Sequence, residues 1–161
     1  MFIESSTGDH PKSPDEILSD INNELVTVLK QHEKDAIQDG MDLGICLIDK
    51  KTRKIIFSGS RNGVYVVNKK GDLKEIKGDY TPVGGFYSKK EKINNRKYET
   101  HEINLKKDEW VFMYSDGYYD QFGGDRNKSM GSTRFKDILV SAVKNEKLLT
   151  SDFKNYFFNW M

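Results

Sequence analysis

Short strand-like runs separated by turn residues fill the middle of the chain and constrain its fold more than any other feature. They occupy residues 43–48, 54–57, 64–67, 73–76, 98–105 and 109–114. Runs of this length with Gly, Asn and Asp between them are typical of short antiparallel strands. The pattern predicts an antiparallel meander, whose last two strands pair across the charged turn 106–108.

Helical patterns lie on both sides of these runs. Ser13, Pro14 and Glu16 predict an N-cap, a first helical residue and a capping box. The apolar residues that follow recur at helical spacing and form one stripe: Ile17, Leu18, Ile21, Leu25, Val28 and Leu29. A second amphipathic helix is expected around residues 135–143, with Ser132 or Thr133 as its cap, and a third over residues 151–161. Strands in the middle and helices outside predict an α+β fold.

Composition favours one soluble domain, or part of one, in a reducing compartment. The chain has 161 residues, of which 36% are hydrophobic and 32% are charged. No apolar stretch approaches the roughly 18 residues that span a bilayer, and no signal peptide opens the sequence. We therefore expect a cytoplasmic location without membrane association. The single cysteine, Cys46, cannot form an internal disulfide and is predicted to pack in the core.

Charge and histidine spacing argue against nucleic-acid binding and against zinc. The net charge is +1, and the densest basic stretch, residues 88–97, is interrupted by Glu91 and has no interleaved aromatic residues. A solvated loop is the expected structure for that stretch. The three histidines lie too far apart for zinc-ligand spacing.

Residues 110–124 carry the strongest functional signal. An apolar run ends at Tyr114 and is followed by Ser115, Asp116 and Gly117. At the end of a buried strand, Asp116 would present its carboxylate to a hard cation. The alternative is a hairpin turn, in which Gly117 supplies a positive φ. Residues 118–122 lack the alternation of a returning strand and end at two glycines, which favours a short helical turn and then a glycine loop.

Four segments together resemble a known family. Residues 39–49, 56–60, 77–84 and 115–124 match, in order and spacing, the C-terminal part of the metal-dependent protein phosphatases (PPM, the protein phosphatase type 2C superfamily) in their SpoIIE-type bacterial branch. The resemblance covers roughly residue 14 to the end. It implies an antiparallel β-sandwich flanked by helices (α/β/β/α), incomplete in this chain. Residues 1–12 are then a flexible N-terminal segment, and residues 13–161 the C-terminal part of the phosphatase domain.

The resemblance also implies a reaction and a set of site residues. Members hydrolyse phosphoserine or phosphothreonine through water activated by two Mg²⁺ or Mn²⁺ ions. The expected substrate is a phosphorylated regulatory protein in bacterial signalling, such as an anti-sigma-factor antagonist. Asp116 matches a metal ligand of the family. Other motif positions are assigned structural roles or roles beside the ligands, with turn capping as the alternative for the aspartates: Gly117, Asp120, Asp79 and Asp42.

The sequence departs from the family at both ends. It lacks the early Asp strand, the Asp-Gly-x-Gly-His-Gly segment and the final Asp. Gly8, Asp9 and His10 are followed by Pro11 and do not replace them. One hypothesis is a phosphatase whose C-terminal part, this chain, is inactive alone. The others are a non-catalytic pseudophosphatase or partner-binding module, and an unrelated binding domain in which Asp116 and Gly117 only form a turn.

The missing strands also predict self-association. A sandwich without its first strands exposes an unpaired edge and part of an apolar face. The residues expected on that face are Leu43, Ile45, Leu47, Phe57 and Val66. We therefore expect a homodimer in which each copy covers the open edge of the other or exchanges a terminal helix with it.

Overall fold

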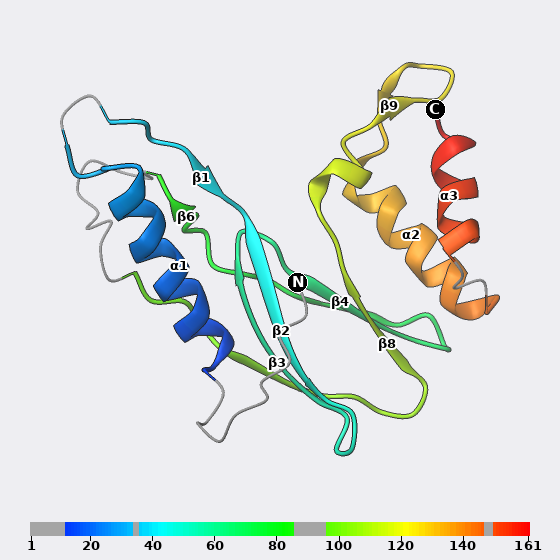
Figure 1. Ribbon diagram of the computed structural model, residues 1–161. Coiled ribbons are helices and arrows are strands. Elements are labelled where there is room, and N and C mark those ends of the chain that lie inside the picture. The colour runs from blue at the N-terminus through cyan, green and yellow to red at the C-terminus, as the bar shows by residue number, and fades with distance from the viewer. Residues whose placement is uncertain (1–11, 34–35, 86–95, 147–149) are drawn as a thin grey trace. The chain divides into compact units, whose positions relative to one another are not determined.

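The computed structural model describes residues 12–33, 36–85, 96–146 and 150–161 (Figure 1). These residues fall into two compact units, one within Met1–Gly63 and Lys77–Leu105, the other within Val64–Ile76 and Lys106–Met161. Both units combine helix with antiparallel sheet, which confirms the α+β class. The predicted flexible segment lies outside the described residues except for Lys12. In the described parts of the chain, no helix has the length and apolar character needed to cross a bilayer.

The first unit is built on one helix and a three-stranded sheet. Its elements are α1 (Pro14–Val28), β2 (Leu43–Asp49), β3 (Lys54–Ser60) and β7 (His101–Asn104), with the strands in the antiparallel order β2-β3-β7. Figure 1 shows α1, in blue, beside β2 and β3. A second, two-stranded sheet pairs β1 (Gly40–Met41) with β6 (Val83–Gly84).

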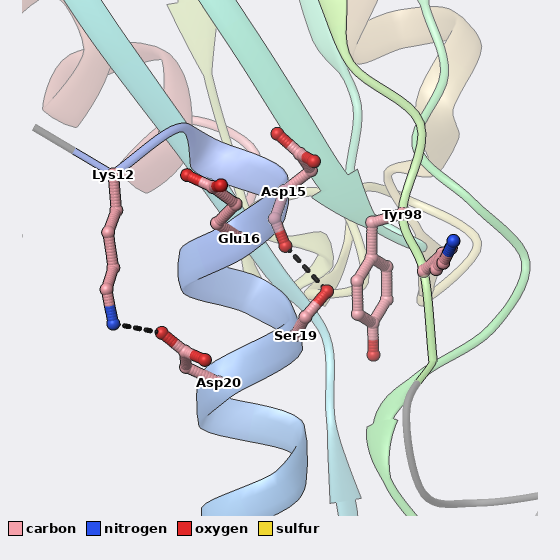
Figure 2. A pocket seen from close by; sticks show the side chains of 7 residues that line it. Lys12, Asp15, Glu16, Ser19, Asp20 and Tyr98 are labelled. Carbon is pink, nitrogen blue, oxygen red and sulfur yellow. Dashed lines mark hydrogen bonds and ion pairs between the residues drawn. The ribbon is translucent and has the colours of Figure 1, made fainter. Parts of the chain in front are cut away.

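The N-terminus of α1 forms as the sequence predicts. The backbone N–H of Ser13 donates to Oε2 of Glu16 at 2.8 Å, which is half of a capping box. Acidic residues here are engaged locally: Lys12 Nζ lies 2.6 Å from Oδ2 of Asp20 (Figure 2). A hydrogen bond from Ser13 lowers the pKa of Asp15. The acids at this end of α1 line a hollow together with Lys12 and Tyr98, and their local contacts and the helix dipole account for them without a ligand.

One residue of the predicted apolar stripe lies on the wrong side of the helix. Val28 is 70% exposed, whereas Leu18 and Val26 are almost fully buried. Val28 is two positions after Val26, which corresponds to about 200° around an α-helix. The buried face therefore follows residues four apart, and it includes the polar residue Asn22.

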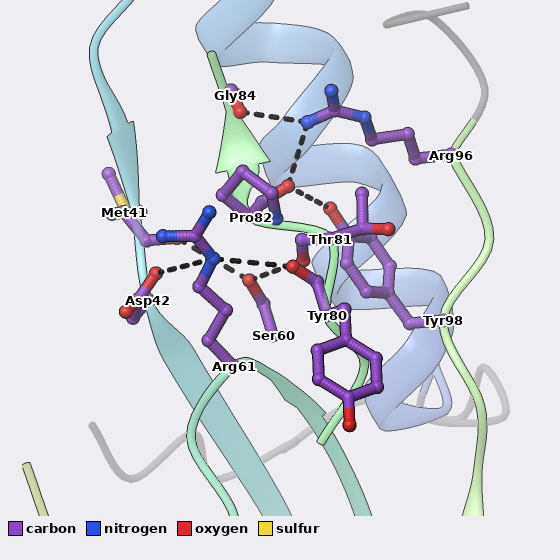
Figure 3. A network of polar contacts seen from close by, with 10 residues as sticks. All are labelled: Met41, Asp42, Ser60, Arg61, Tyr80, Thr81, Pro82, Gly84, Arg96 and Tyr98. Carbon is purple, nitrogen blue, oxygen red and sulfur yellow. Dashed lines mark hydrogen bonds and ion pairs between the residues drawn. The ribbon is translucent and has the colours of Figure 1, made fainter. Parts of the chain in front are cut away.

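Three buried polar side chains hold the chain around Gly84 and Gly85. Asn22 Oδ1 accepts the N–H of Gly84 at 3.0 Å, and Gln31 Oε1 accepts the N–H of Gly85 at 2.9 Å. The Arg96 guanidinium donates to the carbonyls of both glycines at 2.8 Å, and Figure 3 shows the bond to Gly84. Both glycines have positive φ, +70° and +63°. These three side chains form a clamp around Gly84 and Gly85. The clamp supplies hydrogen-bond partners to an irregular buried backbone that regular strand pairing could not satisfy.

The second unit packs two helices on another three-stranded sheet. Its strands are β5 (Leu73–Ile76), β4 (Val64–Asn68) and β8 (Glu109–Met113), in the order β5-β4-β8. After β8 the unit continues with the 3-10 helix η1 (Asp116–Tyr118) and the hairpin of β9 (Phe122–Gly123) and β10 (Lys128–Ser129). It ends with the helices α2 (Gly131–Lys144) and α3 (Thr150–Phe158). The core contains Tyr65, Val67, Phe135, Leu139 and Val143.

Two predictions about this part of the chain were wrong. Strands β7 and β8 do not pair across residues 106–108. Instead β7 pairs with β3 and β8 with β4, so the expected meander is divided between separate sheets. Neither Ser132 nor Thr133 caps α2, whose N-cap is Met130. The N–H groups of Met130 and Gly131 donate to the carbonyls of Gln121 and Tyr119 at 3.0 and 2.8 Å, so the preceding loop performs part of the capping.

The clamp generates a stability prediction. We expect Asn22→Ala to lower the free energy of unfolding by about 1–3 kcal/mol, because it leaves the buried N–H of Gly84 without its acceptor. Chemical denaturation followed by circular dichroism measures this change. Glu24→Ala on the exposed face of α1 is the matched control and should leave stability nearly unchanged. Equal effects of the two substitutions would contradict the clamp.

The edge of the first sheet is the feature relevant to self-association. Strand β2 lies at the end of its sheet and pairs with β3 alone among the described strands. Leu47 and Ile48 are 38% and 48% exposed, and Leu43 and Ile45 are half-buried. By contrast, Phe57 is fully buried. We propose that β2 pairs with β2 of a second copy, because an exposed apolar edge strand recruits another strand.

Light scattering over a range of concentrations tests this proposal. The chain should form a dimer, and Leu47→Lys should shift it toward monomer, since a charge at an edge strand opposes pairing. Val28→Lys is the control, because Val28 is also exposed to solvent but belongs to α1 and not to the edge strand. A monomer at all concentrations would contradict the proposal, as would equal effects of the two lysines.

Candidate functional site

Asp116 lies where a strand gives way to a helical turn. Strand β8 ends at Met113, Ser115 is extended, and η1 begins at Asp116. The Asp116 carbonyl accepts the N–H groups of Tyr119 at 3.0 Å and Asp120 at 2.9 Å. Asp116 is an exposed residue. The predicted order of strand, Asp-Gly and short helical turn is therefore confirmed.

The hairpin alternative is wrong. Gly117 does not have a positive φ, and no strand returns directly after it. A Cβ built on Gly117 would meet only Ser115 Oγ, at 3.7 Å. Neither backbone conformation nor internal packing therefore requires glycine here.

Two tyrosines anchor the loop that carries Asp116. The rings of Tyr118 and Tyr119 lie 5.1 and 5.7 Å from the ring of Phe135 on α2. Tyr118 Oη also donates to the carbonyl of Phe153 at 2.8 Å. Burial raises the pKa of both phenols. This role was not predicted, although the aromatic pair directly after Asp-Gly was a signal for it.

The glycine loop is held by Trp160, which was not among the predicted site residues. Trp160 Nε1 donates to the carbonyl of Gln121 at 3.0 Å, and the Trp160 carbonyl accepts the N–H of Gly124 at 2.7 Å. Gly124 has φ +66°, and a Cβ there would lie 2.8 Å from the Trp160 ring. Gly124 is thus required by both conformation and close packing.

Asp79 has structural partners in the first unit. Its Oδ2 accepts the N–H of Glu99 at 2.7 Å, and its own N–H donates to the carbonyl of Gly59 at 2.7 Å. Its carbonyl accepts the N–H of Arg61 at 2.6 Å. These bonds join neighbouring segments of the unit, so its contacts suit a structural role.

Asp42 makes a weaker contact in the same unit. Its Oδ1 lies 3.8 Å from Nε of Arg61, which also donates to the Tyr80 carbonyl at 3.2 Å (Figure 3). Asp42 and Asp79 therefore belong to the first unit, whereas Asp116 and Asp120 belong to the second. The structure assigns no catalytic role to any of the four, and these roles stay predictions.

The described residues do not complete a metal site. Within residues 12–33, 36–85, 96–146 and 150–161, no group of three or more His, Cys, Asp or Glu side chains is placed to hold an ion. Two Mg²⁺ or Mn²⁺ ions require several oxygen ligands. Asp116 is available as one such ligand, but the present residues alone do not fit a two-metal centre.

Cys46 offers no reactive thiolate. The residue is half-buried on β2, and burial raises the pKa of its thiol to about 11. The thiol is therefore protonated at neutral pH. This environment suits packing rather than nucleophilic chemistry.

The loop geometry makes a prediction that separates two glycines. Gly117→Ala should leave the free energy of unfolding nearly unchanged, because the added methyl makes only an ordinary van der Waals contact, with Ser115 Oγ at 3.7 Å. Gly124→Ala should lower it by about 1–2 kcal/mol or more, because a left-handed conformation disfavours a side chain and the methyl approaches Trp160. Denaturant titration measures both. A large loss of stability in Gly117→Ala would restore the hairpin interpretation.

The comparisons with known proteins agree with this geometry. The family model described as stage II sporulation protein E (SpoIIE) matches residues 3–153. Among solved structures, the SiaA-PP2C domain of Pseudomonas aeruginosa is similar with a TM-score of 0.71 and 22% sequence identity. The alignment covers 89% of this chain and 51% of that chain, so this chain spans about half the length of that structure. No curated protein matches the sequence.

The structural match shows the fold, and the family match shows descent. The fold is that of a PP2C domain, as the sequence predicted. An unrelated binding domain in which Asp116 and Gly117 merely form a turn is thereby excluded. Because the family model extends over nearly all of the sequence, the chain belongs to the stage II sporulation protein E (SpoIIE) family.

Proposed function

We propose that this chain is the C-terminal part of a Mg²⁺- or Mn²⁺-dependent phosphoserine/phosphothreonine phosphatase that acts in bacterial signalling in the cytoplasm. Its substrate is a phosphorylated regulatory protein. The observation that carries the proposal is the exposed Asp116 at the start of η1, in a chain that matches the SpoIIE family model over residues 3–153.

The geometry around Asp116 suits a metal ligand for physical reasons. A hard cation is held best by carboxylates on a rigid support. The Asp116 carbonyl is fixed by two backbone hydrogen bonds, and Tyr118 and Tyr119 fix the following turn on Phe135. The carboxylate itself remains exposed. When bound, the metal ions would supply hydroxide near neutral pH and neutralise phosphoryl charge.

A pseudophosphatase or partner-binding module is the second candidate. It is favoured by the absence of a three-residue metal-ligating group among the described residues. Under this alternative, Asp116 would be an exposed surface carboxylate and the same loop would contact a partner without chemistry.

Manganese-dependent hydrolysis of a phosphoserine peptide tests the proposal. The 161-residue chain alone should show little or no hydrolysis. A chain extended to include the upstream Asp segments and the final Asp of the family should be active. Within that extended chain, Asp116→Asn should reduce kcat by a factor of about 100 or more, because it removes one charged ligand from the metal centre.

Asp137→Asn is the matched control for this experiment. Asp137 is an exposed carboxylate on α2 of the same unit and matches no motif position. It should retain near-normal kcat, and thermal unfolding should show that both variants are folded. Equal activity of the short and extended chains would refute the inactive-alone proposal. An active extended chain indifferent to Asp116→Asn would remove Asp116 from the metal site.

A further inference from the structure

A basic hollow lies beside the β9–β10 hairpin in the second unit. Arg126 and Lys128 from the hairpin, Arg134 from α2 and Trp160 line it, together with one acid, Asp125. The three cations outnumber the acid, so the hollow has a net positive charge. No described carboxylate forms an ion pair with any of the three cations.

The surrounding structure positions these cations. The guanidinium carbon of Arg134 lies 4.0 Å from the centroid of the Trp160 ring, and stacking of this kind orients its planar donors. Trp160 is itself held by hydrogen bonds to Gln121 and Gly124. Lys128 lies opposite Gly123 in the hairpin. The hairpin that forms the hollow is therefore held in place by Trp160, and its cations are not scattered surface residues.

The start of α2 contributes to the same electrostatic environment. Met130 and Arg134 line the hollow, and the first turn of α2 contains no acidic residue and no side-chain cap. The positive end of the helix dipole therefore adds to the field of the side chains. An oxyanion is the ligand class that such a combination attracts.

We propose that the basic hollow binds a phosphate-bearing or acidic segment of a protein partner. The inference rests on the proposed function, because a phosphatase of regulatory proteins needs a surface that recognises phosphorylated segments. A protein is favoured over a free anion because Phe122, on the same hairpin, is 66% exposed. Phe122 does not line the hollow itself, but an exposed aromatic side chain on the hairpin that carries Arg126 and Lys128 suits contact with a peptide. The hollow and the loop of Asp116 lie in one unit, separated by few residues.

Fluorescence anisotropy with labelled peptides tests this inference on the 161-residue chain. The probes are a phosphoserine peptide with acidic flanks, its unphosphorylated form and its glutamate-substituted form. A chelator is present, so that no hydrolysis occurs. The phosphopeptide should bind more tightly than the unphosphorylated peptide and more weakly as salt rises. The double variant Arg126→Gln/Lys128→Gln should bind about tenfold more weakly, since two charge contacts are lost.

Lys106→Gln/Lys107→Gln is the matched control. It removes the same charge from another turn of the second unit and should leave binding near the wild-type level. Thermal unfolding verifies that both variants are folded. Inorganic phosphate should compete only weakly if the peptide, and not the free anion, is the ligand.

Three outcomes overturn the inference. The first is a phosphopeptide affinity of Arg126→Gln/Lys128→Gln within about twofold of wild type. The second is an equal loss of affinity in the control variant. The third is oligonucleotide binding as tight as phosphopeptide binding. The last would indicate a general polyanion site. Because this assay needs neither metal nor activity, its result is independent of the Asp116 experiment. Binding without hydrolysis in the extended chain would refute the proposed enzyme alone.

Discussion

The position of Asp116 depends on aromatic packing around one residue of α2. Phe135 is 4% exposed and contacts the rings of Tyr65, Tyr114, Tyr118 and Tyr119. This cluster ties strands β4 and β8 to the turn η1. Aromatic pairs of this geometry stabilise beyond the area that they bury. A turn that would otherwise be a mobile surface loop is therefore fixed while its carboxylate stays exposed.

Local sequence signals predicted the elements well and the pairing of strands less well. The cap at Ser13 and the strands at residues 64–67 and 73–76 follow from short-range chemistry, and the structure confirms them. The pairing of β7 with β3 depends on which strand edges are free, and no local pattern reports that. The burial of Asn22 was also not predictable, because its partner is the distant N–H of Gly84.

The same distinction applies to the candidate site. The resemblance located Asp116, and the irregular pattern after Gly117 correctly favoured a helical turn over a hairpin. The contribution of Trp160 was not predictable, because it lies 36 residues beyond Gly124 and acts through backbone bonds and ring packing. Likewise, single charges at Arg126 and Lys128 have no meaning in sequence until the hairpin and α2 bring them to one hollow.

The two units are stabilised by different kinds of interaction. In the first, buried polar bonds hold irregular glycine backbone, and the motif aspartate Asp79 is engaged in structural hydrogen bonds. In the second, aromatic packing fixes the turn, and the charged groups Asp116 and Arg126 remain exposed. A metal-binding carboxylate and oxyanion-binding cations carry opposite charges and would pair with each other if they were adjacent. They therefore function best at separate places on one rigid support. Under the proposed function, a substrate segment would engage the hollow without competing for the Asp116 carboxylate, so binding and hydrolysis are expected to separate in the two experiments.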